Sequence, residues 1–435
     1  MEELLHYCWK HRILPLEPLR TTDGKEVEML NPGLHNRDAG PDFLDAKVKI
    51  DGVVWVGNVE LHTRASDWHR HGHDGNPAYE NIILHVVAED DETVRRPDGK
   101  GIPQVLITIP DYVKRNYESL LHDDVAPACR KVLGSIGRLQ VHCWLSALLV
   151  ERMEMRTKQI TERRTVLEGD WEDVFFVTLA RSFGFGKNGD AFEHWALSIP
   201  MSAVGKHKDS LMQVEAIFFG QAGLLEDDGL TDEYYVRLRN EYHYLRRKFG
   251  FAPIDPHEWK FMRMRPQNFP HVRIAQLAML YYGQRLNLSR ILNVKDVEAV
   301  MGLLDTHVSD YWTTHYTFGK ESARRNEKRL SDSSKRLLII NAVAPIAFCY
   351  GRYKGSEQMV EAGLELLEHM RPENNFIVRN WQAAGLMPEN AADSQALIHL
   401  YRQYCSRRDC LRCRFGYEYL RQTPDFLREV EDCKG

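Results

Sequence analysis

The sequence predicts an α+β protein, with a small mixed sheet near the N-terminus and a large all-α region after it. Residues 43–50 alternate apolar and polar side chains as a half-buried strand does, and Asp51-Gly52 is typical of a hairpin turn into a return strand over residues 53–62. Farther along the chain this alternation fades and apolar residues recur at helical spacing. We therefore expect an α/β domain over residues 1–112 and a helical domain over residues 113–435.

Local signals give the order of elements in the α/β domain. An apolar stripe at helical spacing marks the first helix, Asn31-Pro32-Gly33 ends the first strand, and a β-branched run is typical of a buried strand near the end of the domain. In chain order we expect a helix over residues 2–11, strands over residues 27–30, 43–50 and 53–62, one or two helical turns over residues 76–80, and strands over residues 82–87 and 105–109.

The rest of the chain has long helical periodicities separated by glycine or proline. Neither an internal repeat nor a low-complexity tract interrupts them. We expect helices over residues 139–167, 171–183, 211–224, 233–249, 272–282, 296–304, 334–350, 359–369 and 393–404.

The composition is that of a folded protein of two or three domains, with 435 residues, 43% apolar and 27% charged. The net charge is −5, so a surface that binds phosphate groups has to be local. The sequence has no run of 18 apolar residues and no signal-peptide pattern at its start, which argues against a membrane partner. The eight cysteines do not have the pattern of a disulfide framework, and we expect a reducing, cytoplasmic setting.

The expected hairpin holds two acids and a histidine that together suggest a metal site. Asp42 precedes the first strand of the hairpin, and Glu60 and His62 share one face of the second strand because they are two residues apart. Two carboxylates suit Mg²⁺ or Mn²⁺, and such an ion lowers the pKa of its bound water. His62 would orient or deprotonate that water.

Pro41-Asp42 followed by Glu60-Leu61-His62 resembles the motif of the PD-(D/E)XK nuclease superfamily, with histidine in place of the usual lysine. The expected order of helix, three strands, helix and strand is similar to the core of that superfamily. The resemblance implies a metal-dependent nuclease in which Asp42, Glu60 and the Leu61 carbonyl bind the metal and His62 takes the role of the lysine. Histidine differs from lysine there because a neutral imidazole has no fixed positive charge.

The whole chain also resembles a bacterial family of domain-of-unknown-function proteins. That resemblance implies no particular activity, so the function has to be argued from the site. The segments that carry it are Gly40-Pro41-Asp42-Phe43, Gly57-Asn58-Val59-Glu60-Leu61-His62, Ser66-Asp67-Trp68, Ile83-Leu84-His85-Val86-Val87 and residues 263–270.

A second group of candidate ligands follows the hairpin. His69, His71 and His73 alternate after Asp67, and imidazoles on one side of an extended segment suit Zn²⁺ or another borderline ion. For His69 we favour a surface position, while Asp67, His71 and His73 are candidates for the rim of the carboxylate site. His85 lies within an apolar strand and becomes a candidate only if it faces the side of Glu60.

Three cysteines near the C-terminus form a third candidate site. Cys405, Cys410 and Cys413 lie within nine residues and end in a Cys-x-x-Cys pair. Thiolates at this density suit a structural Zn²⁺ or an iron–sulfur cluster, although free cysteines on a helix would give the same pattern. Cys433, Cys129 or a histidine would supply the fourth ligand.

A basic turn is a fourth feature. Arg263, Arg265 and Arg273 surround a proline-broken segment, and guanidinium groups bind phosphate through two hydrogen bonds. The alternative is a loop between helices whose arginines pair with nearby acids.

Three functional hypotheses follow from these features. The first is a metal-dependent nuclease or phosphodiesterase centred on Asp42 and Glu60, with nucleic acid as its partner. The second is a metal hydrolase centred on His71, His73, His85 and Glu60. The third is a non-catalytic scaffold in which a degenerate nuclease fold and a helical platform bind nucleic acid or protein.

Overall fold

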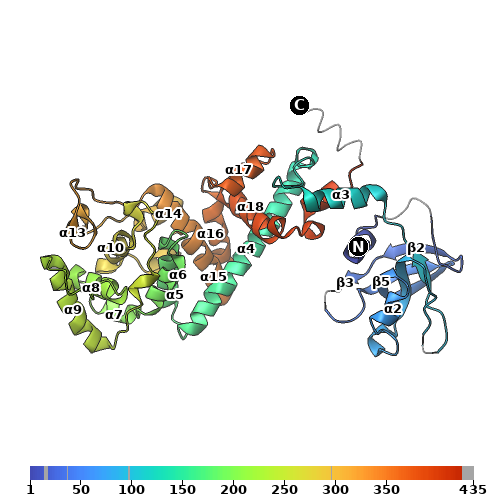
Figure 1. The fold of residues 1–435 in the computed structure, drawn as a ribbon, viewed down its shortest axis with the longest axis horizontal. Coiled ribbons are helices and arrows are strands. Elements are labelled where there is room, and N and C mark those ends of the chain that lie inside the picture. The colour runs from blue at the N-terminus through green and yellow to red at the C-terminus, as the bar shows by residue number, and fades with distance from the viewer. Residues whose placement is uncertain (14–17, 37, 97, 295, 424–435) are drawn as a thin grey trace. The chain divides into compact units, whose positions relative to one another are not determined.

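The computed structural model describes residues 1–13, 18–36, 38–96, 98–294 and 296–423 (Figure 1). Its chain divides into two compact units. The first, which we call the sheet unit, consists of Met1–Val141, Arg379–Leu386 and Leu400–Gly435. The second, the helical unit, consists of His142–Val378 and Met387–His399. The expected boundary after residue 112 therefore falls inside the sheet unit, which also includes a segment near the C-terminus.

A mixed sheet forms the centre of the sheet unit. Its strands run in the order β1-β2-β4-β5-β6-β7, with β3 paired to β4. The pairs β2/β4 and β4/β5 are antiparallel, whereas β5/β6 and β6/β7 are parallel. The strands are β1 (Leu19–Arg20), β2 (Glu26–Asn31), β3 (Leu34–His35), β4 (Phe43–Ile50), β5 (Val53–Arg64), β6 (Ile82–Glu89) and β7 (Gln104–Leu106).

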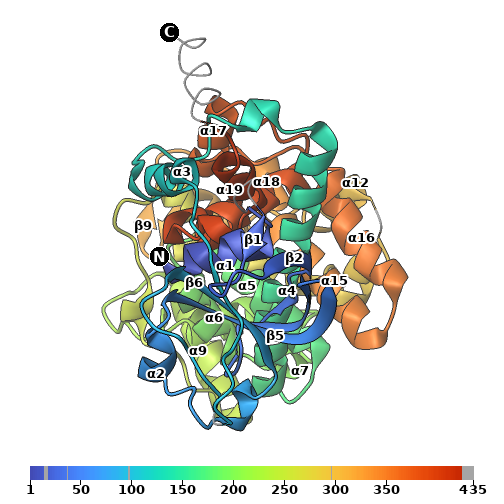
Figure 2. The same cartoon turned by 90° about the vertical axis from the view of Figure 1, so that its right-hand side faces the viewer.

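Two short helices and one longer helix accompany this sheet. α1 (Glu2–Lys10) packs against β5 (Figure 2), and it buries Leu4, Leu5, Cys8 and Trp9 as its apolar stripe predicts. α2 (Asp67–Arg70) also packs against β5, and a 3-10 turn over Pro77–Tyr79 precedes β6. α3 (Asp111–His122) follows the sheet.

The register of the parallel pair places the polar residues of the site. Glu60 on β5 lies opposite His85 on β6, and paired residues of neighbouring strands project on the same face. His85 therefore faces the same side of the sheet as Glu60, so it meets the condition that we set for a site residue. Gly57 is required where the two strands approach, because an added Cβ would lie 2.5 Å from Ile83 Cγ2.

The helical unit is built around aromatic side chains. Phe176 on α5 lies with ring centroids 5.6 Å from both Trp195 on α6 and Phe218 on α8, and all three are buried. A two-stranded hairpin of β8 (His315–Thr317) and β9 (Lys320–Glu321) interrupts what the sequence predicts as entirely helical. α5 is Trp171–Phe183, α6 Gly189–Leu197, α7 Met201–Gly205, α8 Leu211–Gln221, α9 Glu233–Phe249, α10 Pro270–Tyr281, α11 Leu288–Leu292, α12 Val297–Leu303, α13 Asp310–Thr314, α14 Asp332–Leu338, α15 Ala344–Lys354 and α16 Glu357–Glu368.

The remaining helices are α4 (Arg138–Val166), α17 (Phe376–Ala383), α18 (Ala391–Gln403) and α19 (Arg414–Leu420). The α+β class, with a mixed sheet first and helices after it, is confirmed. Across the described residues, no helix is both long enough and apolar enough to cross a membrane.

Candidate metal centre

The carboxylates of Asp42 and Glu60 are each fixed by a backbone N–H across the β4/β5 hairpin. The N–H of Asp42 donates to Glu60 Oε2 at 3.1 Å, and the N–H of Leu61 donates to Asp42 Oδ2 at 2.9 Å. Glu60 is 4% exposed, while the Asp42 side chain keeps 22% of its surface. The hairpin thus positions two carboxylates side by side, one of them buried and the other reachable from solvent.

The two carboxylates repel each other where no cation is present. Burial, and then the charge of Asp42, raise the pKa of Glu60 to about 9 from an ordinary value of 4.5. A divalent cation between the two groups would reverse this effect, because it favours the charged form of both carboxylates. The electrostatics of the pair therefore suit a metal site.

Imidazole nitrogens point at the same two carboxylates. His6 Nε2 on α1 lies 3.3 Å from Asp42 Oδ2, and His73 Nε2 lies 3.1 Å from Glu60 Oε1. His62 Nε2 is 3.8 Å from the same Glu60 oxygen. Within the described residues, the buried Nε2 atoms of His62 and His73 make no hydrogen bond of acceptable geometry. Buried polar atoms without a partner are uncommon, and here they face a pair of acids.

A chain of hydrogen bonds sets the tautomer of His62. Gln104 Nε2 donates to Asp90 Oδ1 at 2.5 Å and to the Glu92 carbonyl at 3.0 Å, so its Oε1 is the atom that accepts from His85 Nδ1 at 3.0 Å. His85 Nε2 must then accept from His62 Nδ1, at 2.8 Å. The proton of neutral His62 is therefore on Nδ1, and its Nε2 presents a lone pair.

His62 stays neutral for a physical reason. Burial, and then the neighbouring imidazoles of His85, His73 and His71, lower its pKa to about 2. His85 is likewise held neutral, since burial lowers its pKa to about 4. Neutral imidazole with a free lone pair is the form that binds a metal ion.

His62 also belongs to a compact group of three histidines. The ligand nitrogens of His62, His71 and His73 lie within 4.8 Å of one another, with His71 exposed and the other two buried. The ring of His73 stacks on Tyr79 with centroids 3.9 Å apart, which fixes its plane. This group shares His62 and His73 with the carboxylate pair, so we treat Asp42, Glu60, His62, His71 and His73 as one unit, the carboxylate–histidine centre.

Asp67 and His69 lie outside this centre. Asp67 is buried, accepts from the Arg64 N–H at 3.1 Å and pairs with Arg70 at 2.9 Å, so its carboxylate holds the turn between β5 and α2. His69 is exposed and pairs with Asp74 at 2.5 Å, as a surface histidine does. Asp67, which we expected at the rim of the carboxylate site, is therefore a structural carboxylate with its own partners.

Sequence reasoning missed His6 and Gln104. His6 lies at the partly buried edge of α1, and its pKa is raised because the nearby Asp42 carboxylate outweighs the opposing effect of burial. Gln104 begins a short buried strand, where a polar residue is an unusual choice. That contrast is the one signal that would have pointed to Gln104.

An open cavity of about 750 Å³ adjoins the centre through His6. Its walls come from α1, the β3 region, α3 and the segment before α19. Four cationic side chains and two acids contribute to it: Lys10, Arg407, Arg408, Arg412, Glu3 and Asp409.

The other candidate residues lie elsewhere. Cys405, Cys410 and Cys413 line a pocket of the sheet unit together with Cys129, whereas Cys433 lies outside the described residues. Arg263, Arg265 and Arg273 belong to the helical unit. Arg273 is buried and donates to Gln276 Oε1 at 2.8 Å and Asn268 Oδ1 at 2.6 Å, so its guanidinium is engaged internally. Arg263 and Arg265 remain exposed.

Fold and site together define an α+β protein of two units with a buried carboxylate–histidine centre on its mixed sheet. The chain belongs to the family described as Protein of unknown function (DUF2851), which matches residues 2–376. The expected resemblance to a domain-of-unknown-function family is thereby confirmed. Comparison with curated proteins and with solved structures gives no match. The matched range includes the whole carboxylate–histidine centre and Cys129, while Cys405, Cys410 and Cys413 lie beyond it.

Proposed function

We propose that this protein is a metal-dependent phosphodiesterase that cleaves nucleic acid. Asp42 and Glu60 hold Mg²⁺ or Mn²⁺, and His62 orients the attacking water. The observation that carries the proposal is the convergence of two backbone-locked carboxylates with the Nε2 lone pair of His62. A cation between them would favour the ionised carboxylate of Glu60 and accept the lone pair of His62, 3.8 Å away in the same buried site.

The arrangement of strands supports a nuclease-like core. A helix, three antiparallel strands (β2, β4 and β5) and a parallel fourth strand (β6) follow in the order that the PD-(D/E)XK resemblance implies. Asp42 directly precedes the second of these strands, and Glu60 lies on the third. One departure is that α2 and a 3-10 turn take the place of a full helix before the fourth strand.

The chemistry follows from the charges of the centre. A bound divalent ion acidifies its water and offsets negative charge on a phosphoryl oxygen. Since burial lowers the pKa of His62 to about 2, His62 is a weak base, and accepting a hydrogen bond from the water suits it better than removing a proton. The backbone of Leu61 binds Asp42 through its N–H, and its carbonyl, which accepts a hydrogen bond from His6, is the third ligand that the resemblance implies.

Charge supports nucleic acid as the substrate. In a chain of net charge −5, the cavity next to His6 gathers Lys10, Arg407, Arg408 and Arg412. Phosphodiester backbones bind to such local clusters of Lys and Arg, and arginine binds phosphate through two hydrogen bonds. The cavity therefore offers a path for a polyanion that ends at the Asp42 carboxylate, which His6 contacts.

Manganese binding tests the proposal. We expect Asp42→Asn and Glu60→Gln each to abolish calorimetric Mn²⁺ binding at this centre and the metal-dependent cleavage of labelled DNA and RNA. Glu89→Gln is the matched control, because Glu89 is an exposed carboxylate on the same sheet that pairs only with Arg64 among the described contacts. Unchanged Mn²⁺ binding in the Asp42→Asn and Glu60→Gln variants would contradict the proposal.

A second candidate function rests on the three clustered histidines. His62, His71 and His73 would hold Zn²⁺ with Glu60 beside them, which gives the donor set of a zinc hydrolase. In that case zinc survives dialysis and is lost in His71→Ala, an exposed position where substitution disturbs packing little, but is retained in Asp42→Asn. A protein that binds nucleic acid without cleaving it, with either metal present, would instead be a scaffold.

A further inference from the structure

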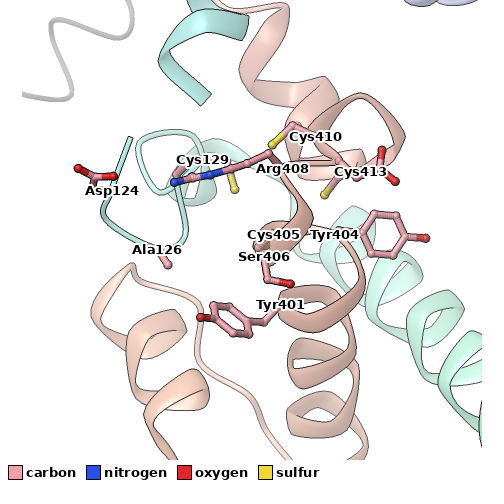
Figure 3. Close-up of a pocket in the computed structure, with 13 residues that line it drawn as sticks. Asp124, Ala126, Cys129, Tyr401, Tyr404, Cys405, Ser406, Arg408, Cys410 and Cys413 are labelled. Atoms are coloured by element: carbon pink, nitrogen blue, oxygen red, sulfur yellow. The ribbon is translucent and has the colours of Figure 1, made fainter. Parts of the chain in front are cut away.

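Four cysteines that are far apart in the sequence line one pocket of the sheet unit. Cys129 lies in the loop after α3, and Cys405, Cys410 and Cys413 lie between α18 and α19. Figure 3 shows the loop with Cys129 on one side of this pocket and the C-terminal segment with the other three cysteines on the opposite side. The pocket has a volume of about 280 Å³. The seven described cysteines form no disulfide, so all four side chains are thiols.

The four thiols affect one another electrostatically. Burial raises the pKa of Cys129 well above its ordinary value, and Cys413, Cys405 and Cys410 raise it further. Burial and the neighbouring thiols Cys413 and Cys410 also raise the pKa of Cys405. Several thiolates in one buried pocket repel one another, and metal binding is the usual way in which proteins offset this repulsion.

The spacing of the thiols discriminates between a single ion and a cluster. Tetrahedral zinc with Zn–S bonds of about 2.3 Å places its sulfur ligands about 3.8 Å apart. Among the described residues, the three histidines of the carboxylate–histidine centre are the one group with three ligand atoms within 4.8 Å of one another. No three of the four Sγ atoms are that close. In an iron–sulfur cluster the cysteines bind different irons, so their sulfur atoms lie farther apart than around a single zinc ion.

The backbone around the pocket is specified in detail. The N–H of Cys413 donates to the Cys410 carbonyl at 3.2 Å, and the N–H of Cys410 donates to the Arg408 carbonyl at 2.9 Å. A Cβ added at Gly416 would lie 2.1 Å from the Cys410 carbonyl oxygen, so only glycine fits there. Asn116 on α3 donates its amide to the carbonyls of Tyr419 at 3.2 Å and Gln422 at 2.9 Å, which ties the two sides of the pocket together.

We propose that Cys129, Cys405, Cys410 and Cys413 ligate an iron–sulfur cluster, with Cys129 as the fourth ligand. The cluster joins the loop after α3 to the segment between α18 and α19. This site is separate from the carboxylate–histidine centre and does not depend on the proposed nuclease activity. Its role is to hold the C-terminal segment in place, as four covalent metal–sulfur bonds stabilise a folded chain.

Metal and sulfide content of the intact chain tests the proposal. The full-length protein, produced with iron supplied and purified without oxygen, should contain iron and acid-labile sulfide in cluster stoichiometry and show the visible absorbance of iron–sulfide charge transfer. Cys129→Ala should lose essentially all iron, sulfide and absorbance. Cys143→Ala is the matched control, because Cys143 is exposed on α4 and lies outside the pocket, and it should keep all three.

Two results would overturn the proposal. Wild-type protein with stoichiometric zinc and no sulfide, or with no metal, excludes the cluster and requires no variant to fold. Full retention of the cluster in Cys129→Ala, together with its loss in Cys433→Ala, would assign the fourth ligand to Cys433. Circular dichroism of each variant shows whether loss of the cluster accompanies general unfolding. Refolded wild-type protein in which the cluster has been reconstituted is the reference spectrum.

Discussion

A single amide determines the state of the histidine at the centre. Because Gln104 Nε2 donates to Asp90 and to the Glu92 carbonyl, the amide can present only its oxygen to His85. His85 must then donate from Nδ1 and accept at Nε2, and His62 must donate from Nδ1. The lone pair of His62 Nε2 is left facing Glu60. Residues that orient a ligand in this way affect metal affinity although they do not contact the metal.

Replacing Gln104 tests this chain of hydrogen bonds. Gln104→Leu leaves His85 Nδ1 and the side chain of Asp90 without this partner, and we expect it to lower the free energy of unfolding by about 1–3 kcal/mol. Without Gln104 the proton of neutral His62 is no longer held on Nδ1, so Mn²⁺ affinity should fall by about 10- to 100-fold. Denaturant unfolding and calorimetry measure the two effects. Asp90→Asn is the control, because an amide oxygen still accepts from Gln104, and equal losses in both variants would contradict the relay.

The raised pKa of Glu60 predicts how the stability of the metal-free protein changes with pH. The folded state holds the Glu60 proton up to a pKa of about 9, whereas the unfolded chain releases it near 4.5. As the pH rises, deprotonation therefore stabilises the unfolded state first, and the stability of the fold that is present below pH 4.5 is lost progressively up to pH 9.

We expect the free energy of unfolding of metal-free protein to fall between pH 7 and pH 9, a window above the ordinary pKa of histidine at 6.5. Glu60→Gln should remove this slope, and so should saturating Mn²⁺, because the cation favours the carboxylate. Urea unfolding at several pH values checks it. A wild-type slope that survives in Glu60→Gln would show that another group is responsible.

At the level of elements, the sequence predicted most of what local pattern controls. Strands 43–50 and 53–62 correspond to β4 and β5, and the helices expected over 171–183 and 233–249 match α5 and α9 residue for residue. Alternation and apolar periodicity decide these elements. The expected helix over 334–350 is instead α14, a π-helical turn over Ile339–Val343 and α15. The spacing of apolar residues does not indicate this change of helix type.

The site was predictable only in part. Asp42, Glu60 and His62 lie on one hairpin, so turn chemistry and strand alternation were enough to bring them together. His6 and Gln104 come from α1 and β7, and their contacts depend on how those elements pack, which a linear pattern does not encode. The sequence named Cys129 as one of three candidates for the fourth ligand, but its place in the pocket depends on tertiary contacts that the sequence alone does not show.

Two glycines make a matched test of packing between helices. A Cβ at Gly220 on α8 would lie 2.1 Å from the ring of Tyr242 on α9, so Gly220→Ala should destabilise the helical unit by about 1–3 kcal/mol. Gly302 on α12 has nothing within 4 Å of an added Cβ, and Gly302→Ala should stabilise by about 0.5–1 kcal/mol because alanine favours helix. Thermal or urea unfolding compares them. Similar effects of the same sign would contradict this packing of α8 against α9.

The molecule as a whole has a negative net charge, whereas one of its cavities has more cationic than acidic side chains. The chain has 62 acidic and 57 basic residues, yet the cavity beside His6 gathers four cations and two acids. General attraction to nucleic acid is therefore weak, and the proposed binding would have to come from this cavity. The proposed cluster contributes here as well, because Arg407, Arg408 and Arg412 belong to the segment that Cys405, Cys410 and Cys413 anchor.

Salt dependence of binding tests that assignment and depends on the proposed function. Arg407 and Arg412 are exposed on the cavity wall, and each phosphate contact contributes about 0.7–0.9 to the slope of log affinity against log salt concentration. We expect Arg407→Ala and Arg412→Ala each to reduce that slope by about one contact and to weaken binding of all sequences alike, with Mn²⁺ binding unchanged. Arg421→Ala is the control, because Arg421 is exposed, pairs with Glu418 and lies outside the cavity. If all three variants alter the slope equally, diffuse surface charge and not the cavity binds the polyanion; if none does, nucleic acid does not enter this path.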